Sequence, residues 1–66
     1  MKRSELLKLF SKNGIMFLQH GKRHDIYYSP ITGNTFPVPR HAKEIAVGTL
    51  KSIMKDAGLE GGKSNG

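Results

Sequence analysis

The residues with the clearest chemical potential lie in one short segment, residues 20–28, with the sequence His-Gly-Lys-Arg-His-Asp-Ile-Tyr-Tyr. Two cations, Lys22 and Arg23, directly precede His24. An imidazole with its ordinary pKa of about 6.5 can accept or donate a proton at neutral pH. Neighbouring cations can hold a phosphate and stabilise the charge that develops in its transition state. We therefore predict that His24 is catalytic in RNA cleavage and that Lys22 and Arg23 bind RNA. The alternative is a solvated polar turn.

The other two histidines are further candidates. In a tight hairpin the ring of His20 could flank the same phosphate as the ring of His24, one as base and one as acid, although histidines at strand ends usually have no such role. His41 follows Arg40, and we expect this pair to contact RNA, with an ordinary polar loop as the alternative for His41. Asp25 is not part of the predicted site, because neighbouring residues on a regular strand point to opposite faces.

The charge of the chain favours a polyanionic partner. Its 66 residues include 11 Lys and Arg against 5 Asp and Glu, a formal net charge of +6. Nucleic acid is the usual partner of such a chain. An anionic membrane surface would require a long amphipathic helix with cations along one face, and none is visible. No apolar run approaches the ~20 residues that span a bilayer. We expect RNA, and no membrane, as the partner.

Composition also limits the chemistry and the compartment. The chain has no cysteine, and its three histidines show no recognisable zinc spacing. We therefore expect no metal and no cofactor. No apolar stretch of the kind found in secretion signals follows Lys2 and Arg3, so we expect a cytoplasmic protein. A chain this short forms one domain at most and is only marginally stable alone.

The hydrophobic pattern predicts five elements in the order helix, strand, strand, strand, helix. The predicted helices are residues 4–13, with Ser4 as N-cap, and 46–57. The predicted strands are residues 15–20, 25–29 and 35–38, and Pro37 favours an edge position for the last of them. Together they predict an α+β fold with two helices on one face of a three-stranded antiparallel sheet, the α-β-β-β-α order of a double-stranded-RNA-binding-like domain. Residues 1–59 would form this domain and residues 60–66 a disordered tail.

The same pattern identifies the core. Tyr27 and Tyr28 must face opposite sides of their strand. We expect Tyr28 to be the core residue, since it shares a face with Ile26, and Tyr27 to be free for an RNA base or a protein partner. The remaining predicted core residues are apolar side chains of the two helices: Leu6, Leu9, Phe10, Leu50, Ile53 and Met54.

A series of motifs extends along most of the chain. They are Lys2-Arg3-Ser4-Glu5-Leu6, Asn13-Gly14, Gly21-x-x-His24, Val38-Pro39-Arg40-His41 and the segment 48–59. In this order and spacing the sequence resembles the HicA-type toxins of bacterial toxin–antitoxin pairs, small ribonucleases that cleave messenger RNA. The resemblance implies a double-stranded-RNA-binding-like fold, metal-independent cleavage and a HicB-type antitoxin that covers the active site. It places the catalytic histidine at His24. Lys22 stands where many members have a small hydroxyl residue.

Three classes of function remain open from the sequence. The first, which we expect, is a toxin: a metal-independent endoribonuclease that cuts mRNA through His24 and is neutralised by a HicB-type antitoxin. The second is an RNA-binding module of the same fold, which requires the cations but no catalytic histidine. The third is a protein-interaction subunit, which would leave the net charge of +6 unexplained except by an acidic partner.

Overall fold

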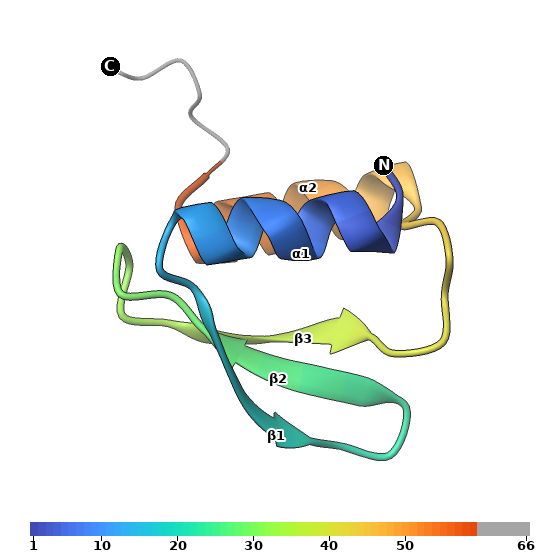
Figure 1. The fold of residues 1–66 in the computed structure, drawn as a ribbon, viewed down its shortest axis with the longest axis horizontal. Coiled ribbons are helices and arrows are strands. Elements are labelled where there is room, and N and C mark those ends of the chain that lie inside the picture. Colours follow the sequence, from blue (N-terminus) through green and yellow to red (C-terminus); the bar gives the residue numbers. More distant parts are fainter. Residues whose placement is uncertain (60–66) are drawn as a thin grey trace.

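The computed structural model describes residues 1–59. Its elements are α1 (Arg3–Lys12), β1 (Met16–His20), β2 (His24–Tyr28), β3 (Thr35–Pro39) and α2 (Val47–Ala57). The strands form one antiparallel sheet in the order β1-β2-β3, and the two helices lie side by side over one face of it (Figure 1). The predicted α+β fold is therefore confirmed, whereas the predicted tail, residues 60–66, lies outside the described residues.

The start of α1 is fixed by the segment that precedes α2. Lys2, not Ser4, occupies the N-cap position, so the predicted Ser4 cap is wrong. Lys2 forms an isolated β-bridge with Glu44, and the backbone N–H of Arg3 donates to the carbonyl of Lys43 at 2.8 Å. These long-range backbone contacts start the helix earlier than its local sequence suggests. They also bring Arg3 to the end of the sheet where β3 finishes.

The core lies between the helices and the sheet. The ring of Phe10 in α1 packs against Phe36 of β3, with ring centroids 5.6 Å apart, in an edge-to-face arrangement. Leu50 and Met54 are only partly buried against this core. The buried apolar residues are Leu6, Phe10, Ile15, Phe36, Val38, Ile45, Ile53 and Ala57. This set confirms the predicted core positions Leu6, Phe10 and Ile53. The predicted core residue Leu9 is not in it and is only half-buried.

Tyr27, not Tyr28, packs against the core, so the sequence-based choice between them is wrong. Tyr27 pairs with Phe36 in the sheet, which places both on the face covered by the helices. The ring centroid of Tyr27 lies 5.2 Å from that of Phe10. The prediction placed Tyr28 in the core because it shares a face with Ile26. However, Ile26 pairs with Pro37, away from the helices.

A β-bulge interrupts β1. Phe17 pairs with Tyr27 and Gln19 with Ile26, so Leu18 is an extra residue without a partner in β2. Every residue of β1 is exposed, and in Figure 1 this strand forms the sheet edge farthest from the helices. An extra residue shifts the alternation of side chains along a strand. Strict alternation along β1 therefore assigns side chains correctly on one side of the bulge only, because the faces are exchanged beyond it.

The loop between β2 and β3 caps the C-terminal end of α2. The buried hydroxyl of Ser29 donates to the carbonyl of Ala57 at 2.6 Å, and the hydroxyl of Thr32 donates to the carbonyl of Asp56 at 2.6 Å. The last carbonyls of a helix have no partner within the helix. These two side chains supply partners and fix the helix against the sheet.

Two glycines of this region provide a matched test of the packing. Gly33 and Gly58 both have left-handed backbones, with φ of 77° and 81°. A Cβ at Gly58 would lie 2.7 Å from Ile31 Cγ2 and 2.9 Å from Thr32 Cγ2, whereas a Cβ at Gly33 would meet no atom within 4 Å. We expect Gly33→Ala to lower the free energy of unfolding by about 1–2 kcal/mol, from the backbone alone. Gly58→Ala should lower it by more, because the loop must also move. Urea denaturation measures both, and equal decreases would contradict the close contact of loop and helix.

Candidate functional site

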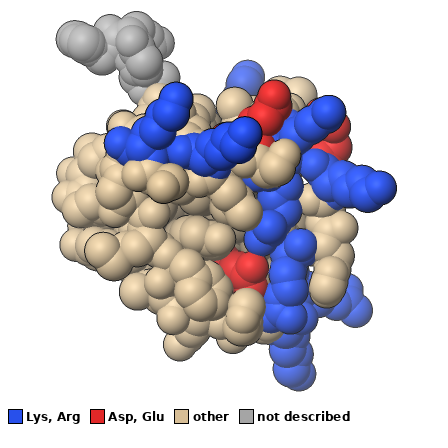
Figure 2. Space-filling view, viewed as in Figure 1, with Lys and Arg blue, Asp and Glu red and all other residues tan. Residues whose placement is uncertain are grey.

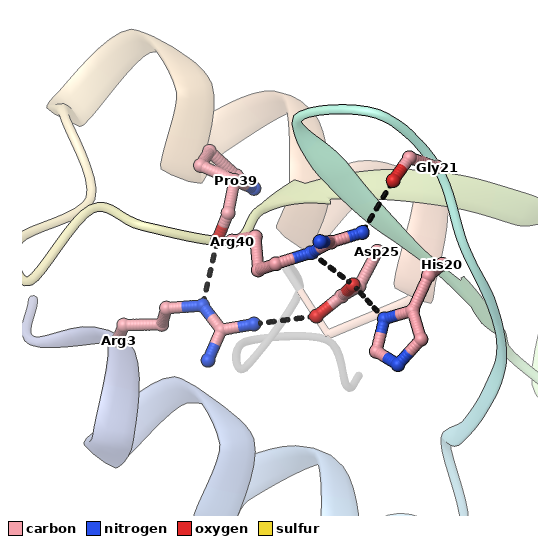
Figure 3. A network of polar contacts seen from close by, with 6 residues as sticks. All are labelled: Arg3, His20, Gly21, Asp25, Pro39 and Arg40. Carbon is pink, nitrogen blue, oxygen red and sulfur yellow. Dashed lines mark hydrogen bonds and ion pairs between the residues drawn. The ribbon is translucent and has the colours of Figure 1, made fainter.

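The carboxylate of Asp25 is the centre of a polar network at the end of the β1–β2 hairpin (Figure 3). Its Oδ1 accepts a hydrogen bond from Arg40 Nε at 3.0 Å and lies 2.7 Å from His20 Nδ1. Its Oδ2 accepts from Arg3 Nη2 at 3.0 Å. The Asp25 side chain is only 8% exposed. A carboxylate this deeply buried requires such partners, because burial without them is unfavourable.

The two arginines extend the network to the backbone. Arg3 Nε donates to the carbonyl of Pro39 at 2.6 Å, and Arg40 Nη2 donates to the carbonyl of Gly21. The backbone N–H of Arg40 also donates to the carbonyl of Arg23 at 3.1 Å. The network thus joins the first turn of α1, both strands of the hairpin and the residues after β3. Arg40, predicted as an RNA contact, has part of its hydrogen-bonding capacity engaged inside the protein.

These contacts set the protonation state of the network. The hydrogen bond with His20 and then that with Arg40 hold the pKa of Asp25 below its ordinary value of 3.8, although burial alone would raise it. Asp25 is therefore ionised at neutral pH and accepts from Nδ1 of His20. This contact orients the ring so that Nε2 points away from the carboxylate. The His20 side chain is 68% exposed, so Nε2 is accessible.

His24 lies in a different environment. It is exposed at the start of β2 and lines a hollow of about 320 Å³ together with Pro37 and Pro39 of β3. The other side of the hollow belongs to α2: Gly48, Thr49, Ser52, Ile53 and Asp56. The hydroxyls of Thr49 and Ser52 and the carboxylate of Asp56 thus line the same hollow as the imidazole of His24. Sequence reasoning missed these α2 residues, since nothing in their local pattern connects them to His24.

The register places His20 and His24 on opposite faces of the sheet. His20 pairs with Asp25, so these two side chains share a face. His24 is the neighbour of Asp25 on the same strand, and neighbours on a strand point to opposite faces. The idea that both rings flank one phosphate is therefore wrong. Asp25 does orient a histidine, but the histidine is His20.

The other predicted RNA contacts lie around the hairpin turn and the loop after β3. Lys22 and Arg23 are exposed in the turn and form no ion pair within residues 1–59. His41 is exposed in the loop, where its side chain makes no hydrogen bond to another described residue. Lys and Arg side chains gather on one side of the molecule, from α1 down to the tip of the hairpin (Figure 2). The turn cations thus belong to a wider positive surface.

No group of three or more His, Cys, Asp or Glu side chains in residues 1–59 is arranged to hold a metal ion. Over the same residues, no helix is both long and apolar enough to cross a membrane.

Comparison with known proteins identifies the family. The model of the family described as HicA toxin of bacterial toxin–antitoxin matches residues 3–59, nearly the whole described chain. The chain belongs to the HicA toxin family. No curated protein and no solved structure gives a significant match. As a HicA toxin the chain is the toxin of a toxin–antitoxin system, which implies an antitoxin partner. The matched range contains both histidine environments and the turn cations Lys22 and Arg23.

The Asp25 network predicts an acid-dependent loss of stability in this HicA toxin. Because the pKa of Asp25 is lowered by folding, its ionised form stabilises the folded state. This contribution is present above about pH 3.8 and is lost as pH falls through the lower pKa of the folded protein. We expect the melting temperature to fall across this range in the wild type and to fall less steeply in Asp25→Asn, which should be less stable at neutral pH. Asp56→Asn is the control, because Asp56 forms no ion pair within residues 1–59. Parallel profiles for wild type and Asp25→Asn would rule out this role.

Proposed function

We propose that this HicA toxin is a metal-independent endoribonuclease that cleaves mRNA with His24 as its catalytic residue. The observation that carries the proposal is the exposed imidazole of His24 beside two exposed cations, in a chain of the HicA toxin family. Its imidazole is exposed, directly follows two exposed cations and lines a hollow large enough to admit part of a nucleotide. A histidine that served only the core would be buried and hydrogen-bonded.

The reaction that such a site supports uses the RNA's own nucleophile. Removal of the proton from a 2′-hydroxyl allows its oxygen to attack the adjacent phosphorus. The bond from phosphorus to the 5′-oxygen breaks, and that oxygen takes up a proton. The products are a 2′,3′-cyclic phosphate and a 5′-hydroxyl. His24 would perform one of the two proton transfers, a contribution of about 10²–10⁴-fold to the rate.

The surroundings of His24 divide the remaining tasks. Lys22 and Arg23 would bind phosphates next to the scissile bond and stabilise its developing charge. We assign Arg40 and His41 to further contacts with the RNA backbone. Arg40 acts there mainly through its charge, because Asp25 and Gly21 accept from two of its nitrogens. None of these steps requires a metal.

The antitoxin partner follows from the same surface. We propose a HicB-type antitoxin that covers His24 and the turn cations with carboxylates, in a cytoplasmic complex. Charge complementarity with a chain of net charge +6 would speed association. Carboxylates at the phosphate positions would exclude RNA.

Removal of the imidazole tests the catalytic assignment. We expect His24→Ala to lower the RNA cleavage rate by about 10²–10⁴-fold and to abolish growth inhibition. Its free energy of unfolding should change by no more than about 0.5 kcal/mol, because the side chain is exposed.

Wild-type cleavage should continue in excess chelator and give RNA products with 2′,3′-cyclic phosphate ends.

The comparison variant is His41→Ala, which removes an exposed histidine outside the hollow. It should bind RNA more weakly but cut saturating RNA at a rate far closer to that of the wild type than His24→Ala does. A folded His24→Ala protein as active as its parent would disprove the assignment. Wild-type protein that binds RNA without cutting it would instead support a non-catalytic RNA-binding module.

The salt dependence of binding tests the turn cations. In the His24→Ala background the RNA stays intact, so equilibrium affinity can be measured at several salt concentrations. For single strands the slope of log affinity against log salt is about −0.7 per phosphate neutralised. Lys22→Gln with Arg23→Gln should make the slope less negative by about 0.7 for each phosphate that is no longer neutralised. The matched control is Lys51→Gln with Lys55→Gln on α2. An unchanged slope in the turn variant would place the phosphate-binding residues elsewhere.

A further inference from the structure

The bulge at Leu18 brings two aromatic rings together on the surface. Phe17 and His20 are separated by two residues, and on a regular strand they would face opposite sides of the sheet. The extra residue changes this. Phe17 pairs with Tyr27, and His20 pairs with Asp25, which lies on the same face as Tyr27. The ring centroids of Phe17 and His20 are 4.8 Å apart. Bulges are frequent beside functional sites, where they re-aim a side chain.

Both rings are held in place from behind and open in front. The Phe17 ring packs edge-to-face on Tyr27, with centroids 5.7 Å apart, and Tyr27 in turn packs on the core ring of Phe10. The Asp25 carboxylate fixes His20 at 2.7 Å. Phe17 is nevertheless 44% exposed, because β1 projects beyond the helices (Figure 1). The pair thus presents an aromatic surface that a flat ligand can reach from solvent.

The charges around this pair indicate the chemistry of the ligand. Arg40 and Arg3 share the Asp25 carboxylate with His20 and are part-buried beside it (Figure 3). Aromatic rings next to guanidinium groups are the usual surface for an unpaired nucleotide, whose base stacks while its phosphate meets the cation. Met16 and Leu18 are also exposed on this strand. An apolar protein segment would bind these two aliphatic side chains better than it would bind the Phe17–His20 pair.

We propose that Phe17 and His20 form a stacking subsite for one unpaired nucleotide of bound RNA, with the adjoining phosphate at Arg40. This inference rests on the proposed ribonuclease function. Because His24 lies on the opposite face, the nucleotide at Phe17 is not the one that is cut. The RNA strand instead crosses the tip of the hairpin, where Lys22 and Arg23 hold its backbone. The subsite therefore requires single-stranded RNA on one side of the cleavage point.

The test uses the His24→Ala protein, which should bind RNA without cutting it. A short single-stranded RNA carrying 2-aminopurine reports stacking through quenching of its fluorescence. Phe17→Leu keeps the apolar volume and the charge but removes the aromatic face. We expect it to weaken single-strand affinity about five-fold or more and to reduce the quenching, with the salt slope unchanged. Phe17→Trp should restore both affinity and quenching.

Two comparisons make the result specific. Leu18→Ala, on the same strand and also exposed, should bind and quench as the parent does. A fully paired RNA duplex should bind Phe17→Leu and its parent equally, because it offers no free base. If Phe17→Leu keeps the RNA affinity and the quenching of its parent, the proposed subsite is wrong. If the variant instead weakens only the complex with the antitoxin, the surface is a protein interface. If the parent binds no RNA at all, the proposed function itself fails.

Discussion

The buried carboxylate of Asp25 is the interaction on which the rest of this small structure depends. It meets two guanidinium groups and one imidazole, from Arg3, Arg40 and His20, where α1, the hairpin and the end of β3 converge. Every β1 residue is exposed, so this strand buries less apolar surface than its neighbours. The polar contacts of His20 and Gly21 add to the packing of Phe17 on Tyr27 in holding the hairpin. Loss of the carboxylate would leave the Arg3 and Arg40 guanidinium groups close together without a counter-charge.

The register of the strands decides both histidine environments. Asp25 pairs with His20 and with the buried Val38, so its side chain lies on the helix-covered face and its neighbour His24 on the other. A slip of one residue in β2 would exchange these faces. Asp25 would then lose its partners, and His24 would enter the helix-covered side.

The sequence was sufficient for the parts of the fold that local patterns determine. Helical spacing, turn residues and Pro37 predicted the elements, their order and the edge position of β3, all of which the structure confirms. Lys22, Arg23 and His24 are neighbours in the chain, so their proximity required no tertiary information. The side-chain faces of β1 were harder to predict, because the bulge at Leu18, which the sequence does not reveal, changes the alternation along this strand.

The long-range part of the candidate site was not predictable for a different reason. Arg3 and Arg40 reach Asp25 from segments far apart in the chain, and no local pattern marks an arginine as the partner of a particular carboxylate. The tyrosines illustrate the same limit. Alternation shows that Tyr27 and Tyr28 face opposite sides, but only the pairing with β3 decides which side the helices cover.

Pro37 and Pro39 have a consequence for the behaviour of the free toxin. A three-stranded sheet has two open edges, and an open edge can recruit a strand from another copy and start aggregation. β3, one of these edges, carries two residues that have no N–H to offer an incoming strand. The other edge, β1, is interrupted by its bulge. The two prolines therefore disfavour sheet extension at β3, and the bulge makes β1 a poorer template for a strand from another copy.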